Sequence, residues 1–108
     1  RVARQEVCGT VLAGPRFSQG DGAERLSRVN GTEYGLSGSV WTGDISRALR
    51  LAKKVDSGQV GINAHAAISP ETPFGGNKQS GWGREFGRDG LEAYFKTKAI
   101  SINLGPHS

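Results

Sequence analysis

The sequence has 108 residues, of which 35% are hydrophobic and 22% charged, and 17 are glycine. This length allows one small domain or part of one, and the composition is too apolar for a wholly disordered segment. Lys and Arg number 14 against 10 Asp and Glu, for a net charge of +4. Because the basic residues are scattered, we favour a solvated surface over a nucleic-acid-binding stripe.

Cys8 is the only cysteine, which excludes an internal disulfide and favours a reducing, cytoplasmic location. No stretch approaches the roughly 18 apolar residues of a membrane span, so we expect no contact with a membrane. The chain begins at Arg1 and contains no methionine. We therefore expect it to be a processed or excised part of a longer product.

The first half of the chain alternates short strands and helices. Residues 7–13 indicate a strand that ends at Gly14 and Pro15. Residues 21–29 predict a one-sided helix that Asn30 and Gly31 stop. The alternation over residues 36–42 predicts a second strand.

The clearest helix starts after Asp44, a residue suited to cap it. Its apolar residues recur with helical spacing up to Val55, and Gly58 lies just beyond the end. Residues 59–63 then form a short predicted strand. Strand, helix and strand over residues 36–63 indicate a βαβ unit of a parallel sheet, so the predicted fold class is α/β.

Residues 64–87 show no sustained period and contain two prolines and several glycines, which predicts a long functional loop. A helix is expected over residues 89–97. A last strand is expected over residues 100–104, where Ile100, Ile102 and Leu104 alternate with polar residues.

The glycines of the loop do not have phosphate-binding spacing. Gly76 and Gly81 are followed by Trp82 instead of the Lys-Ser/Thr of a P-loop, and Gly87 falls one residue late for a dinucleotide fingerprint. Asn30-Gly31-Thr32 has the form of a glycosylation acceptor, but we interpret it as a helix stop. Cys8, Glu6 and His65 could be interpreted as the nucleophile, the orienting residue and the base of a catalytic site. A cysteine buried on a strand is the simpler interpretation.

Four ordered blocks resemble motifs of the NAD(P)-dependent aldehyde dehydrogenase family. They are residues 6–9 (EVCG), similar to E-x-F-G-P; 30–36 (NGTEYGL), similar to N-x-T-x-Y-G-L; 58–63 (GQVGIN), similar to G-x-V-x-I-N; and 73–85 (PFGGNKQSGWGRE), similar to P-F-G-G-x-K-x-S-G-x-G-R-E. The resemblance implies a fragment of the parallel-sheet catalytic domain over residues 1–98, followed by an oligomerisation strand and tail over residues 99–108.

The resemblance also implies a chemistry. A cysteine thiolate attacks an aldehyde, hydride passes from the thiohemiacetal to NAD or NADP, and water activated by a glutamate hydrolyses the thioester. Nucleophile, base and dinucleotide domain belong to family motifs upstream of this chain. The resemblance therefore implies no catalytic residue here and no activity of the chain alone.

By the same resemblance, Glu6 matches the carboxylate that accepts hydrogen bonds from the nicotinamide ribose. Cys8 stands where the family has an aromatic residue beside the nicotinamide, and Thr10 stands where it has proline. Both differences from the family pattern predict less tight positioning of the cofactor.

Phe74 and the loop residues Ile68 and Ser69 match the segment that lines the mouth of the family's substrate tunnel. An apolar wall there helps to exclude water and sorts aldehydes by shape, although core packing is the simpler interpretation of Phe74. His65 is expected to face solvent. Arg84, Glu85 and the glycines are expected to be architectural.

The sequence leaves two alternatives to an enzyme fragment. One is a non-catalytic oligomerisation or interaction module, since the family's last strand joins subunits into a homo-oligomer. The other, suggested only by the basic charge, is a nucleic-acid binder. Neither the aldehyde nor the choice between NAD and NADP can be read from this part of the protein.

Overall fold

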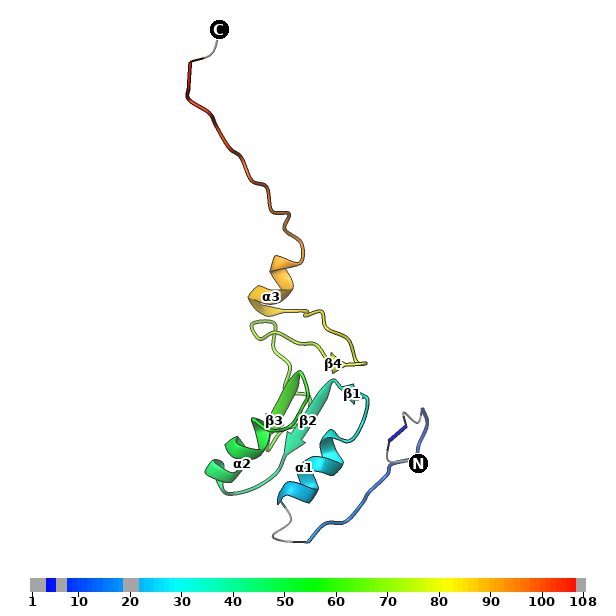
Figure 1. Cartoon of the computed structure of the whole chain (residues 1–108). Helices are drawn as coiled ribbons and strands as arrows, with labels where there is room; N and C mark the ends of the chain where they lie inside the picture. Colours follow the sequence, from blue (N-terminus) through cyan, green and yellow to red (C-terminus); the bar gives the residue numbers. More distant parts are fainter. Residues whose placement is uncertain (1–3, 6–7, 19–21, 107–108) are drawn as a thin grey trace.

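A computed structural model of the chain describes residues 4–5, 8–18 and 22–106. Three helices and four short strands follow one another along it (Figure 1). In chain order they are α1 (Gly22–Asn30), β1 (Tyr34–Gly35), β2 (Ser37–Val40), α2 (Ile45–Ala52), β3 (Gln59–Ile62), β4 (Asn77–Lys78) and α3 (Gly87–Glu92).

The centre of the fold is the β2–α2–β3 unit. Strands β2 and β3 are parallel, in a register that runs from Ser37 opposite Gln59 to Val40 opposite Ile62. Parallel strands need a crossover, and α2 provides it. This confirms the predicted βαβ unit and the α/β class, with both strands shorter than predicted.

Helix α2 begins where the sequence indicated. The Arg47 amide donates to Asp44 Oδ1 at 3.0 Å, and this bond holds the pKa of the Asp44 carboxyl below its usual range. The helix ends at Ala52, short of the predicted Val55. Beyond this end, the Asn30 side chain donates to the Lys54 carbonyl and accepts from the Asp56 amide, which ties the turn after α2 to the end of α1.

The remaining elements position the two ends of the long loop. Helix α1 ends at Asn30, as expected from Asn30-Gly31. The two-residue strands β1 and β4 pair antiparallel, so the segment after the loop returns beside the start of β2. Helix α3 spans only six residues and ends at Glu92, so the prediction of a helix up to residue 97 was wrong.

Two predicted strands do not form within this chain. Residues 8–13 and 99–106 belong to no helix or strand. Leu12 is 92% exposed, and Ile100, Ile102 and Leu104 are 77 to 90% exposed. A strand is stable only against another strand or a packed layer, and neither stretch has one here.

Little of the apolar surface is covered. Ala48 is the only fully buried hydrophobic residue among those described, whereas Trp41, Ile45 and Leu91 are more than half exposed. The radius of gyration of 20.7 Å far exceeds the roughly 13 Å of a compact domain of this length. Figure 1 shows the cause, a C-terminal segment that runs away from the body. In the described part of the chain, no helix has the length and apolar character needed to cross a membrane.

Candidate functional site

The loop between β3 and β4 carries the three predicted substrate-facing residues, and its first residue is firmly held. Asn63 has a φ of 51°, which turns the chain as it leaves β3. Its side chain accepts from the Thr42 amide and donates to the Thr42 carbonyl, both at 2.9 Å. The start of the loop is thereby fixed beside the end of β2.

The middle of the loop forms two tight turns. In the first, the Ile68 amide donates to the Ala66 carbonyl at 2.8 Å. In the second, the Thr72 amide donates to the Ser69 carbonyl at 3.1 Å, and the Thr72 and Ser69 hydroxyls lie 3.3 Å apart. Ser69 also acts on Glu71, because its hydroxyl hydrogen-bonds the carboxylate and lowers the pKa of Glu71.

The end of the loop closes against the segment that leads into α3. Phe74 and Glu85 form an antiparallel bridge, with amide-to-carbonyl distances of 2.8 and 2.7 Å. The Gly87 amide donates to the Pro70 carbonyl at 2.9 Å. Phe74 is half-buried and Ile68 is 44% exposed, so both still present apolar surface.

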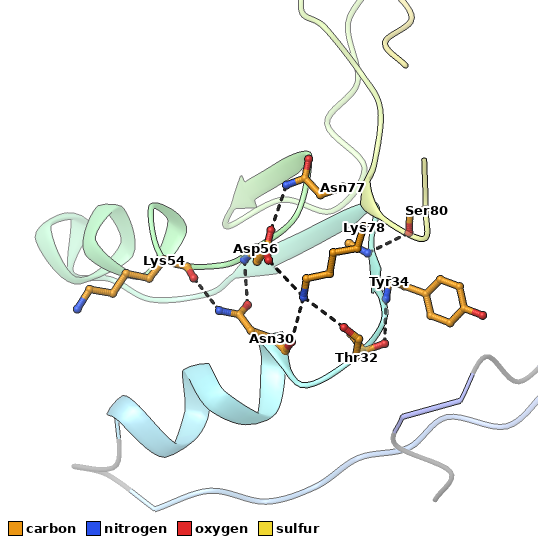
Figure 2. Close-up of polar contacts among 9 residues, drawn as sticks. Asn30, Thr32, Tyr34, Lys54, Asp56, Asn77, Lys78 and Ser80 are labelled. Carbon is orange, nitrogen blue, oxygen red and sulfur yellow. Dashed lines mark hydrogen bonds and ion pairs between the residues drawn. The ribbon is translucent and has the colours of Figure 1, made fainter. Parts of the chain in front are cut away.

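A polar cluster ties the segment after the loop to the body of the fold. We define it as Asn30, Thr32, Asp56, Asn77 and Lys78. Lys78 Nζ donates to the carbonyls of Asn30 and Thr32 at 3.0 and 3.2 Å and lies 3.3 Å from Asp56 Oδ2. Asn77 donates to Asp56 Oδ1 at 3.2 Å. Figure 2 shows these residues together, from the end of α1, the turn before β1, the turn after α2, and β4. The cluster holds β4 at a defined distance from the parallel sheet.

Two glycines at the start of the glycine-rich segment are closely surrounded by the chain's own atoms. An added Cβ at Gly75 would overlap the Gly83 carbonyl oxygen, and one at Gly76 would come within 2.5 Å of Ser80 Cβ. Arg84 donates to the Gly76 carbonyl at 2.7 Å and to Asn77 Oδ1 at 3.1 Å. Gly75 and Gly76 therefore have no room for a side chain, and Arg84 hydrogen-bonds neighbouring parts of its own chain, which agrees with the prediction that these residues are architectural.

Of the two predicted cofactor residues, only Cys8 is among the described residues. Glu6 lies outside the described residues. Cys8 is a free and exposed thiol, so the interpretation of a cysteine buried on a strand was wrong. Residues 8–13 form no strand because no other strand of the described residues pairs with them. Figure 1 shows residues 8–18 on the α1 side of the fold, away from the loop after β3. Among the described side chains, no group of three suited to a metal comes together.

Comparison with known proteins identifies the family. The sequence profile of the Aldehyde dehydrogenase family matches residues 1–100. The chain belongs to the aldehyde dehydrogenase family. It is 42% identical over 101 residues to the cytosolic 10-formyltetrahydrofolate dehydrogenase of Xenopus tropicalis, covering 94% of this chain and 11% of that protein. It is also 42% identical over 105 residues to the betaine aldehyde dehydrogenase of Rhizobium leguminosarum bv. trifolii, covering 97% of this chain and 21% of that protein.

Solved aldehyde dehydrogenases share the fold. The apo betaine aldehyde dehydrogenase of Staphylococcus aureus superposes with a TM-score of 0.89 at 39% identity, over 100% of this chain and 21% of that one. A complex of the same enzyme with NAD+ gives a TM-score of 0.75 at 41% identity, over 81% of this chain and 17% of that one. The chain thus spans about a tenth to a fifth of the length of the aldehyde dehydrogenases it matches.

Several residues that hold the loop were not found from the sequence. Gln59, Asn63 and Lys78 act through backbone carbonyls and amides of residues distant in sequence. Asn63 and Lys78 stand at fixed positions of the motifs quoted above, but those motifs do not show which backbone groups they bind. Such bonds leave no periodic pattern, so a single sequence cannot reveal them. His65 is exposed, as predicted.

Proposed function

We propose that this chain is the C-terminal part of an NAD(P)+-dependent enzyme that oxidises an aldehyde to a carboxylic acid. The observation that supports it most is the family match over residues 1–100. The nucleophilic cysteine and the general base of the proposed enzyme lie upstream. The chain's own contribution is the loop of residues 64–74.

In this proposal Phe74, Ile68 and Ser69 form part of the wall at the mouth of the substrate site. The half-buried Phe74 and the exposed Ile68 supply apolar surface that excludes water from the reacting carbonyl. Ser69 is engaged in its own turn, which fixes its hydroxyl. Two relatives that are equally identical to this chain are named for different substrates. We therefore propose only the class of substrate, an aldehyde, and no single compound.

The cofactor of the complete enzyme is proposed to be NAD or NADP, which accepts the hydride. Glu6 and Cys8 are the residues proposed to lie near its nicotinamide. The exposed Cys8 thiol offers less apolar surface than the aromatic residue it replaces. The free thiol also suits the proposed cytoplasmic location.

The test uses the complete protein that contains this chain. We expect it to reduce NAD+ or NADP+ with an aldehyde, and the isolated 108-residue chain to give no such turnover. Phe74→Ala should raise KM for bulky aldehydes, and Glu6→Gln should slow hydride transfer while the upstream thiol still reacts with an alkylating agent. Turnover by the isolated chain that is lost in Cys8→Ala would contradict the proposal.

A second proposal concerns assembly into a homo-oligomer through residues 99–108. Ile100, Ile102 and Leu104 are 78, 77 and 90% exposed on an extended segment, which favours burial against another subunit. Assembly through these residues is compatible with a catalytic protein. It is also the function proposed under the alternative of a non-catalytic oligomerisation or interaction module.

A further inference from the structure

Gln59 connects the parallel sheet to the candidate substrate loop. It is the first residue of β3, and its Nε2 donates to the Ala67 carbonyl at 2.8 Å. Its own backbone is held on both sides. The Gln59 amide donates to the Leu36 carbonyl at 3.2 Å, and the Ser57 hydroxyl donates to the Gln59 carbonyl at 2.9 Å. The Gln59 side chain therefore extends from a backbone that hydrogen bonds hold in place.

The loop folds back over the face of β3 that carries Gln59. Alternate residues of a strand share a face, so Gly61 lies on the same face as Gln59. An added Cβ at Gly61 would overlap the Ala64 carbonyl oxygen. The positive φ angles of Asn63 and Ala66, both 51°, produce the reversal. The close approach at Gly61 and the bond from Gln59 therefore bring residues 64–67 onto one face of one strand.

The bond from Gln59 fixes a single peptide unit. The Ala67 carbonyl and the Ile68 amide belong to the same planar group. The carbonyl accepts from Gln59, and the amide donates to the Ala66 carbonyl at 2.8 Å. With both ends held, rotation of the plane is restrained, and with it the position of the Ile68 Cα from which the side chain extends.

We propose that Gln59 is a positioning residue that sets aldehyde specificity by fixing the Ala67–Ile68 peptide. The proposal rests on the proposed function, because it assumes that Ile68 faces the substrate. Gln59 occupies a variable position of the G-x-V-x-I-N block, so the hydrogen bond from Gln59 to Ala67 is a property of this chain and not of the motif. Gln59 acts through Ile68 and takes no part in the chemistry.

Two variants of the complete protein remove the donor. Gln59→Leu keeps the approximate size of the side chain, and Gln59→Glu keeps its shape but only accepts hydrogen bonds when ionised. Gln79→Leu is the matched control, because Gln79 is an exposed residue next to β4. If Gln59→Leu does not fold, Gln59→Glu carries the experiment.

The first measurement is hydrogen exchange of the backbone amides in residues 64–72. We expect exchange at Ile68 to rise roughly 2- to 12-fold in both Gln59 variants, the range that the net contribution of one hydrogen bond implies. Exchange in α2 and in the Gln79→Leu control should stay as in the wild type. Unchanged exchange at Ile68 would overturn the proposal whether or not the protein oxidises aldehydes.

The second measurement is steady-state oxidation of acetaldehyde and phenylacetaldehyde. We expect the Gln59 variants to change the ratio of kcat/KM between the two aldehydes by a similar 2- to 12-fold factor, through KM, with kcat for acetaldehyde little changed. An equal loss of kcat for both aldehydes would mean general damage and would overturn the specificity role. Absence of turnover in the wild type would instead count against the proposed function.

Discussion

The middle of the chain and its two ends are stabilised in different ways. Residues 30–92 hold together through their own polar contacts, chiefly the polar cluster around Lys78, the Asn63 bonds to Thr42 and the Arg84 bonds to Gly76 and Asn77. Residues 8–18 and 93–106 have exposed side chains throughout. Hydrogen bonds can thus define the shape of a segment whose apolar surface is still exposed.

The two regions also differ in what they require from other parts of the protein. The apolar side chains of the ends, such as Leu12 and Leu104, are about 90% exposed. Burial of a side chain of this kind contributes roughly 1.5–3 kcal/mol. Contact with a further surface would therefore stabilise the ends, whereas the loop of residues 64–74 keeps its form through bonds within the chain.

The largest expected effect comes from Gly58→Ala, which tests the close contacts of the middle region. An added Cβ at Gly58 would overlap the Gly75 carbonyl oxygen, and backbone atoms cannot move aside as a flexible side chain can. We expect the complete protein to lose about 3 kcal/mol of stability, seen as a lower Tm. Gly43→Ala is the control, because nothing lies within 4 Å of its added Cβ. Equal Tm values would mean that the contact between Gly58 and Gly75 relaxes freely.

The second prediction tests the C-terminal end. In the complete protein, Ile102→Lys should weaken subunit assembly about 10- to 100-fold, because roughly 1.5–3 kcal/mol of burial is lost. Sedimentation over a range of concentrations measures the shift to smaller species. Ser101→Lys adds the same charge on the other side of the alternation and should have less effect. An unchanged assembly in Ile102→Lys would remove these residues from the proposed interface.

The smallest expected effect concerns the cap of α2 and is a dependence on pH. The folded-state pKa of Asp44 lies below the ordinary value of 3.8, so the cap stabilises fully above pH 3.8 and loses its effect as the pH falls through the folded-state pKa. Asp44→Asn should keep most of the stability, because asparagine caps as well as aspartate, and should lose this dependence. Asp44→Ala should lower the Tm at neutral pH by less than Gly58→Ala. Thermal melts between pH 2 and pH 7 compare the three proteins, and identical curves would exclude a role for the carboxylate charge.

Some features could be read directly from the order of residues. The βαβ unit follows from local alternation and from a helical repeat with a capping Asp44, and each of these patterns lies within a short window. The family follows from four ordered blocks, of which residues 73–85 are the longest. The candidate wall residues Phe74, Ile68 and Ser69 came with that resemblance, and the structure places all three on one loop.

Contacts between residues distant in sequence determined the features that local patterns did not predict. Helix α2 ends at Ala52, and the turn beyond it is held by Asn30, whose side chain, 24 residues earlier in the chain, donates to the Lys54 carbonyl. The apolar stretch at residues 7–13 and the apolar alternation at residues 100–104 are suited to strands, but a strand exists only where a second backbone pairs with it. Gln59 could not be singled out, because its role depends on the Asn63 and Ala66 reversals that bring Ala67 back over β3. Local patterns thus determined which segments can form helices and strands, while bonds between distant residues determined where those elements end and how the loop is held.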